Sequence, residues 1–326
     1  MKIRLVSDLH IDVNRKFKVS FSGLEDVFTL ISGDISGYPD MTISWLKNNI
    51  SKGIFISGNH DVYMKDSRSI ESIKEKYHRA FPENSDITYL DNDVGVVSKE
   101  LEDGTLVVGD VLYTDYTLPC HGNETGNVKR NMFRAVPRMS SGGLNDFVYG
   151  RTRNPKYGPV VYQKKRLYYL TPEWYLDHFN RAFGEITRIV EENKDRNIIL
   201  MTHHCLHKNC IDDYYVNDSL NASYVSDKEK WILDHPNIRL VLSGHVHTRR
   251  IFKVGTAKYV LNPLGYCRDQ YEMVNRDTNK YEKWTPNVFV DTKSWNVEIE
   301  PWENPEWDRL CKEYNDMILK YAGIFM

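Results

Sequence analysis

The sequence lacks any apolar run approaching the roughly 18 residues that a membrane-spanning helix needs. Its first apolar stretch, Ile3–Val6, is too short for the hydrophobic part of a secretion signal. Cysteine is scarce, and an odd, scattered number of cysteines favours a reducing compartment over a disulfide framework. The five are Cys120, Cys205, Cys210, Cys267 and Cys311. These absences predict a cytoplasmic protein without a membrane partner.

An excess of charge of one sign is also lacking. The 43 basic and 45 acidic residues leave a formal net charge of −2. That balance argues against a protein whose whole surface coats nucleic acid or a membrane. The chain has 326 residues, of which 41% are hydrophobic, enough for one large core. We expect a single domain over residues 1–326, and nothing in the sequence indicates an obligate protein partner.

Apolar stretches alternate with amphipathic ones along residues 1–112, which predicts stacked α/β layers. The expected strands there are Ile3–Ser7, Val27–Ser32, Ile54–Ser57 and Thr105–Gly109. The expected helices are Ile43–Asn49 and Ser69–Phe81, the second capped by Asp66 or Ser67. Further along we expect a helix capped by Thr171, strands Asn197–Thr202 and Ile238–Ser243, helix Lys228–Leu233, strands Lys258–Asn262, Val288–Asp291 and Trp295–Glu300, and a helix at about 305–326.

Residues 113–170 differ from the rest of the chain. Between Lys129 and Leu170 there are ten basic residues and one acidic residue, Asp146, a local balance of +9. Tyrosines are interspersed among the basic residues, and periodicity fades. Arginine suits phosphate oxygens and tyrosine can stack on bases. We therefore expect an insertion that caps a cleft and contacts substrate through Arg151 and Arg153, although a solvated basic loop would give the same pattern.

Five short motifs follow apolar runs, at the ends of expected strands, where an α/β sheet presents its chemistry. They are Asp8-Leu9-His10, Gly33-Asp34, Gly58-Asn59-His60-Asp61, Thr202-His203-His204 and Gly244-His245-Val246-His247. Gly-Asp alone is a common turn. The last motif is more specific, because two histidines at i and i+2 of an extended segment point the same way.

The motifs supply two acids, one amide and four imidazoles without a thiolate. Such a set suits Mn, Fe or Zn better than a structural zinc or a calcium cage. Seven ligands are too many for one tetrahedral ion, and they suffice for two if one carboxylate bridges. Two ions can clamp the attacking and leaving oxygens of a displacement and generate hydroxide at neutral pH.

In their order and residue types the five motifs resemble the calcineurin-like metallophosphoesterase superfamily. Three further stretches resemble a bacterial and phage subgroup of its predicted phosphohydrolases: Leu112–Tyr116, Leu144–Phe147 and Asn262–Tyr266. The resemblance implies a four-layer α/β/β/α sandwich of two mixed sheets flanked by helices. It also implies two metal ions, one held by Asp8, His10, Asp34 and His247 and the other by Asp34, Asn59, His203 and His245.

The remaining roles follow from the same resemblance. Asp34 would bridge the ions, and His60 would act as a general acid or stabilise the transition state, with Asp61 orienting it. His203 and His204 are adjacent, and the pattern favours His203 as the ligand, leaving His204 to contact substrate. The run from His203 to Cys210, H-H-C-x-H-x-x-C, keeps a separate zinc site open as an alternative.

The function expected is metal-dependent hydrolysis of a phosphomonoester or phosphodiester, with a nucleotide among the candidate substrates. A nuclease or nucleic-acid end-processing phosphatase is the alternative that the basic insertion motivates. Steep salt dependence would distinguish it from an enzyme for small esters. A phosphoprotein phosphatase ranks lower, because a long insertion would narrow an open groove, and a metal-free scaffold ranks lowest.

Overall fold

The computed structural model describes residues 1–14, 21, 27–63, 68–82, 84–137, 143–157, 160–162, 166–266, 273–275, 280–282, 284–302, 305 and 309. The helix expected at 305–326 therefore lies, apart from residues 305 and 309, outside the described residues. None of the described helices is both long enough and apolar enough to cross a membrane.

Two six-stranded mixed sheets form the centre of the molecule. The first has the order β17-β16-β1-β2-β3-β4, and the second β12-β13-β11-β10-β6-β5. The strands of the first sheet are β1 (Lys2–Val6), β2 (Phe28–Ser32), β3 (Gly53–Ile56), β4 (Ile87–Tyr89), β16 (Val288–Asp291) and β17 (Val297–Ile299). Those of the second are β5 (Ser98–Glu100), β6 (Leu106–Asp110), β10 (Ile198–Thr202), β11 (Ile238–Ser243), β12 (Arg250–Val254) and β13 (Ala257–Leu261).

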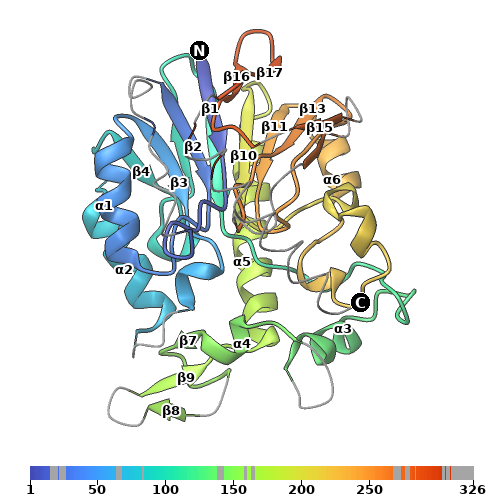
Figure 1. The fold of residues 1–326 in the computed structure, drawn as a ribbon. Helices are drawn as coiled ribbons and strands as arrows, with labels where there is room; N and C mark the ends of the chain where they lie inside the picture. The colour runs from blue at the N-terminus through green and yellow to red at the C-terminus, as the bar shows by residue number, and fades with distance from the viewer. Residues whose placement is uncertain are drawn as a thin grey trace.

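Helices cover the outer faces of both sheets (Figure 1). Over the first sheet lie α1 (Pro39–Asn49) and α2 (Ile70–Ala80), whose apolar residues pack on β2 and β3. Over the second lie α5 (Pro172–Glu192) and α6 (Glu229–Asp234), which pack on β10 and β11. A third apolar layer lies between the sheets. The expected four-layer α/β/β/α architecture is confirmed.

Alternation along the central strands explains why there are three apolar layers. In β10, Ile199 and Met201 pack between the two sheets. Ile198 and Leu200, which alternate with them, pack toward α5. Successive side chains of a strand point to opposite faces, so a continuous apolar run is needed where both faces are buried. The continuous apolar runs of the sequence thus specify strands whose side chains pack into two different apolar layers, one on each face of the sheet.

Two helix starts differ from the sequence-based expectation. The cap of α2 is Ser69, whose hydroxyl accepts from the backbone N–H of Ser72 in a reciprocal capping box, and not Asp66 or Ser67. The first helix begins at Pro39 rather than Ile43, because proline is well tolerated in a first turn. Thr171 caps α5 as expected.

The basic insertion forms its own small elements at the end of the molecule opposite the N-terminus (Figure 1). They are α3 (Val128–Ala135), α4 (Asp146–Tyr149) and a three-stranded sheet of β7 (Arg151–Thr152), β9 (Leu167–Tyr169) and β8 (Val160–Tyr162). A separate two-stranded sheet consists of β14 (Met273–Asn275) and β15 (Lys280–Glu282). Short 3-10 turns are η1 (His60–Val62), η2 (Asn92–Val94), η4 (Lys208–Cys210), η5 (Asp213–Tyr215) and η6 (Asn221–Ser223).

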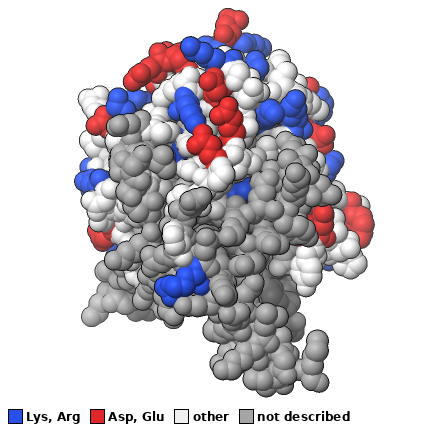
Figure 2. Space-filling view, turned by 45° about the horizontal axis from the view of Figure 1, so that its top comes forward, with Lys and Arg blue, Asp and Glu red and all other residues white. Residues whose placement is uncertain are grey.

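Charges of both signs are interleaved at the edge of the sheets where β1 begins (Figure 2). Lys2 pairs with Glu300 there, with 2.5 Å between Nζ and Oε1. Exposed pairs of this kind contribute little to stability. On this face the described residues show no field of one sign that would attract a polyanion.

Candidate metal centre

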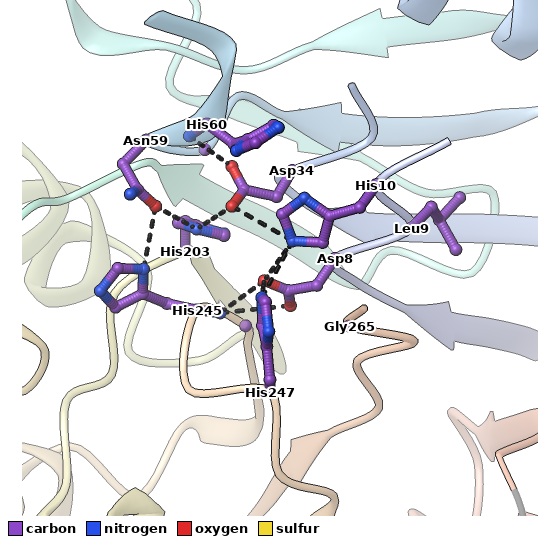
Figure 3. Close-up of polar contacts among 12 residues, drawn as sticks. Asp8, Leu9, His10, Asp34, Asn59, His60, His203, His245, His247 and Gly265 are labelled. Carbon is purple, nitrogen blue, oxygen red and sulfur yellow. Dashed lines mark hydrogen bonds and ion pairs between the residues drawn. The ribbon is translucent and has the colours of Figure 1, made fainter. Parts of the chain in front are cut away.

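The five motifs lie together at the carboxyl ends of the parallel strands of both sheets (Figure 3). Asp8 and His10 follow β1, Asp34 follows β2, Asn59 and His60 follow β3, His203 follows β10, and His245 and His247 follow β11. Parallel strands whose carboxyl ends meet at one edge place their following residues side by side. Residues that are far apart in the sequence are thereby brought to one point between the two sheets.

The backbone at these motifs is in the sparsely populated left-handed region. The φ angles are 51° at Asp8, 43° at His10, 53° at Asp34, 71° at His245 and 51° at His247. Such conformations cost non-glycine residues on the order of 1 kcal/mol or more each and persist only where the surrounding structure imposes them. Five strained residues in one cluster indicate that the placement of these side chains is maintained at the expense of backbone energy.

At two motif positions a carboxylate oxygen lies so close to the backbone that only glycine fits. A Cβ at Gly58 would overlap Oδ1 of Asp34, and one at Gly244 would lie 2.5 Å from Oδ2 of Asp8. Both approaches are far closer than a van der Waals contact. The two glycines therefore allow the carboxylates to lie against the backbone of the neighbouring motifs.

The first set of candidate ligands consists of Asp8, His10, Asp34 and His247, which offer one donor atom each, all within 4.8 Å of one another. Nε2 of His10 lies 2.9 Å from Nε2 of His247 and 3.7 Å from Oδ2 of Asp34. Burial, with the neighbouring His247, lowers the pKa of His10 well below its usual value. A neutral imidazole presents a lone pair, so this set fits a cation.

The second set joins Asn59, His203 and His245 to Asp34. Oδ1 of Asn59 lies 2.9 Å from Nε2 of His203 and 2.9 Å from Nδ1 of His245. Oδ2 of Asp34 lies 3.3 Å from Nε2 of His203. The same carboxylate oxygen therefore faces both sets, the position that a bridging ligand would occupy.

The chemistry of His203 fits a metal as well. Its Nδ1 lies 2.8 Å from the carbonyl oxygen of Ser32, so Nδ1–H donates there and Nε2 faces the other donors. Burial lowers the pKa of His203, but the charge of Asp34 and its hydrogen bond outweigh burial and raise it to about 9. The nearby carboxylate thus favours a positive charge at this position, here the proton on His203. A bound metal ion would supply a positive charge in its place.

His204 lies outside both sets. Its ring is fully buried and stacks on the ring of His245, with centroids 4.0 Å apart and an interplanar angle of 27°. Burial, together with the neighbouring His203, lowers its pKa well below the usual value. The structure thus places His203 among the donors and His204 behind His245, where it supports that ring.

His60 contacts the cluster without joining either set. Its backbone N–H donates to Oδ1 of Asp34 over 2.8 Å, and its ring lies edge-on to that of His10, with centroids 4.6 Å apart. Nε2 of His60 lies 3.2 Å from Oδ2 of Asp12. Burial lowers the pKa of His60, but this hydrogen bond and the charge of Asp34 outweigh burial and raise it.

The partner of the His60 ring among the described residues is therefore Asp12 and not Asp61. Asp61 accepts from the backbone N–H of Gly58 over 2.7 Å and from the hydroxyl of Tyr77. Burial and the charge of Asp34 raise its pKa to about 7. Sequence reasoning missed Asp12, although its position two residues after His10 was the available signal.

A polar chain connects Asn59 to the basic insertion. Nδ2 of Asn59 donates to the hydroxyl of Tyr63 over 2.8 Å, and that hydroxyl donates to Oδ2 of Asp146 over 2.7 Å. Tyr175 of α5 donates to the other oxygen of Asp146 over 2.5 Å. These bonds determine which way the amide points and leave its oxygen facing His203 and His245. Asp146, the single acidic residue counted in the basic stretch, is thus the residue that supports the cluster.

The two arginines expected to bind substrate have other partners. The guanidinium of Arg153 pairs with Glu75 of α2, with 2.7 Å between Nη1 and Oε1. Nη1 of Arg151 donates to the carbonyl oxygens of Val148 and Gly150, each over 2.9 Å. The described contacts of both arginines thus lie within the insertion or on α2, away from the metal cluster.

The alternative zinc site in the loop after β10 gains no support from the described residues. Among the residues that the structure describes, groups of donor atoms close enough to hold a metal occur around His10 and not around His207 or the cysteines of that loop. The ring of His207 packs on Phe252, with centroids 5.2 Å apart.

The resemblance carried by the motifs extends over most of the chain. Residues 1–249 match the model of the calcineurin-like phosphoesterase family. The chain belongs to that family. It is therefore a phosphoesterase hydrolase, and its family typically holds a dinuclear metal site. No match to a curated protein was found.

Three solved structures are similar to this calcineurin-like phosphoesterase at low sequence identity, and the first of them shares its fold. The phosphopantetheinyl hydrolase PptH from Mycobacterium tuberculosis is 14% identical with a TM-score of 0.60, covering 93% of this chain and 98% of that chain. The protein TT1561 of Thermus thermophilus is 12% identical with a TM-score of 0.44, covering 87% and 98%. A putative 5'-nucleotidase from Staphylococcus aureus is 12% identical with a TM-score of 0.40, covering 97% and 58%.

Proposed function

We propose that this chain hydrolyses the phosphate ester of a small compound at a centre of two metal ions. The proposed ligands of one ion are Asp8, His10, Asp34 and His247, and those of the other are Asp34, Asn59, His203 and His245. The observation that carries the proposal is the position of Asp34 Oδ2, which faces His10 at 3.7 Å and His203 at 3.3 Å. We propose Mn, Fe or Zn as the ions, because nitrogen and oxygen donors without thiolate suit them.

Ions bound there would activate water and neutralise charge on the phosphate. Hydrolysis adds one water to phosphorus, breaks the ester P–O bond, and leaves the alcohol oxygen in need of one proton. We assign that proton to His60, which lies beside the cluster but outside both sets of donors. Oδ2 of Asp12 lies 3.2 Å from Nε2 of His60 and so orients the ring. Water returns the proton to His60 when the cycle closes.

A small ester is favoured over a nucleic acid as the substrate. The nuclease hypothesis depended on free basic side chains in the insertion, and Arg151 and Arg153 bond instead to carbonyl oxygens and to Glu75. Arg138, Lys164 and Lys165 lie outside the described residues. The two arginines expected to bind substrate are therefore engaged within the protein.

The test is a screen of model monoesters and diesters with Mn, Fe, Zn, Ni and Mg, using wild type and Asp34→Asn. We expect metal-dependent turnover in the wild type and a fall of roughly a thousandfold or more in the variant, since the bridging charge supports both ions. Metal content of both proteins is measured in parallel. Turnover independent of metal, or an Asp34→Asn variant that binds metal and turns over like wild type, would refute the proposal.

A further inference from the structure

A pocket of about 480 Å³ opens beside the candidate metal centre. Its walls come from two loops, residues 211–224 between β10 and α6 and residues 245–248 after β11. His245 and His247, proposed ligands of the two different ions, form part of the lining. An ester whose phosphate lies on the ions would therefore have its alcohol part within reach of this pocket.

The charged side chains that line the pocket, apart from the two histidines, are the carboxylates Asp212 and Asp218. Among the described lining residues there is no lysine or arginine. Arg250 approaches Asp212, with 3.6 Å between Nη2 and Oδ2, but it is itself buried. Oδ1 of Asp218 accepts from the backbone N–H of Leu220 over 2.7 Å. The lining thus presents carboxylate oxygens, with the charge of Asp212 partly offset by Arg250 and that of Asp218 without an ion pair among the described residues.

Tyrosine rings provide the other part of the lining. The ring of Tyr224 lies against that of His245, with centroids 5.0 Å apart and an interplanar angle of 32°. Tyr215 also lines the pocket and is 55% exposed. Aromatic faces give contact area to carbon atoms of a ligand without requiring a particular charge. The lining therefore combines apolar surface with acceptors, a combination that suits a polar organic group and disfavours a second anion.

We propose that this pocket binds the alcohol part of the substrate, and that it selects an alcohol bearing hydrogen-bond donors and no second anionic group. The donors are hydroxyl or ammonium groups, the chemistry that polyols and amino alcohols share. The inference rests on the proposed phosphoesterase function and adds its selectivity. An anionic alcohol is disfavoured because its charge would meet Asp212 and Asp218 with no described cation in the lining.

Two esters of nearly equal size give the sharpest test. Glycerol 3-phosphate and 3-phosphoglycerate differ chiefly in a hydroxymethyl group that becomes a carboxylate. We expect kcat/KM to be higher for the first by about tenfold or more in the metal-loaded wild type. The double variant Asp212→Asn/Asp218→Asn should bring that ratio toward unity. Asparagine can keep the local turn that each aspartate makes with its backbone, so the fold should persist.

The matched control is Asp213→Asn, because Asp213 adjoins Asp212 in sequence, is 85% exposed, and does not line the pocket. It should leave the ratio as in wild type. Phosphoethanolamine serves as the ammonium arm. A preference for phosphoethanolamine over glycerol 3-phosphate would show that the pocket recognises an ammonium group. The opposite preference would show that it recognises hydroxyl groups, and either result supports the inference.

Turnover of p-nitrophenyl phosphate distinguishes a failure of the pocket assignment from a failure of the proposed function. Metal-dependent turnover with a ratio near unity in the wild type, or with a ratio that the double variant leaves unchanged, would overturn the pocket assignment alone. Absence of metal-dependent turnover with every ester would overturn the proposed function and the pocket assignment with it. Thermal melting of each variant identifies any loss of fold.

Discussion

Two segments outside the sheets approach the candidate metal centre, and they carry opposite charge. The basic insertion at 113–170 reaches it through the carboxylate of Asp146, which bonds to Tyr63 and through Tyr63 to Asn59, while Arg151 and Arg153 bond within the insertion or to α2. The loop between β10 and α6 begins with His203 and walls the adjoining pocket with carboxylates and tyrosines. Local charge counts in the sequence pointed to the first segment for substrate recognition, whereas the pocket lies in the second.

The difference shows what a local charge count leaves out. A run of basic residues in the sequence gives the number of cations in a segment. It does not tell which carbonyl and carboxylate groups bond to those cations after folding. Arg134, for example, donates to the carbonyl oxygens of His121 and Gly122 over 2.7 and 3.1 Å. Each cation that bonds to its own segment is unavailable to a ligand. Four changes would break or sharpen this comparison.

The largest effect is expected from the carboxylate of the insertion. Asp146→Asn weakens the acceptor that orients Tyr63 and hence the amide of Asn59, and Tyr63→Phe removes the intermediate hydroxyl. Loss of such supporting hydrogen bonds typically lowers metal affinity or activity by about 10- to 100-fold. Metal titration and kcat/KM with p-nitrophenyl phosphate measure both. Full activity and full metal affinity in both variants would show that the insertion contributes nothing to the centre.

A smaller effect is expected from the aromatic wall of the pocket. Tyr215→Ala removes a lining ring, and we expect KM for an ester with a bulky alcohol to rise by about fivefold, since a partly buried ring contributes on the order of 1 kcal/mol. Tyr214→Ala is the matched control, because Tyr214 is 85% exposed and does not line the pocket. Equal effects of the two substitutions would argue against binding in the pocket.

A smaller effect still is expected when the arginines are removed. The triple variant Arg151→Ala/Arg153→Ala/Lys156→Ala removes three cations that all have partners within the protein. The partner of Lys156 is Asp177, with 2.6 Å between Nζ and Oδ2. We expect KM for a small ester to change by less than about twofold. A tenfold rise in KM, or a steep new salt dependence, would restore Arg151 and Arg153 as substrate-binding residues and reverse the comparison.

No change in kcat/KM is expected from His178→Gln, which alters stability instead. His178 of α5 is fully buried, with Nε2 2.7 Å from Oδ1 of Asp110. Burial lowers its pKa, but Asp110 and Asp93 outweigh burial and raise it above the usual value. The protonated form is therefore favoured in the folded state. Its stabilisation is fully present below an unfolded pKa of about 6.5 and is lost as pH rises through the folded pKa.

Urea unfolding of wild type and His178→Gln at several pH values measures this effect. The wild type should be more stable at pH 6 by about 1.5–3 kcal/mol, the range for a hydrogen bond to a charged group, and the difference should shrink toward pH 9. A difference that stays constant over this range would mean that packing, and not protonation, accounts for it.

Much of the fold and the cluster followed from the sequence. Strands buried on both faces give continuous apolar runs, and motifs at their ends converge because parallel strands end at one edge. Asp12 could have been found from its position two residues after His10, whereas Tyr63 was missed because it acts through contacts between loops that no spacing encodes. The role of Asp146 was missed for the same reason, since its partners Tyr63 and Tyr175 are 83 and 29 residues away.

The three apolar layers have a consequence for insertions and deletions. Alternate residues of β10 serve two separate cores, and His203 follows the strand directly. Deleting one residue within Ile198–Thr202 would exchange the layers that its side chains fill and turn the following histidine to the other side of the sheet. Substitutions among apolar residues of the strand leave that direction intact. Changes of length in the central strands should therefore be far less tolerated than changes of side chain, even where no site residue is touched.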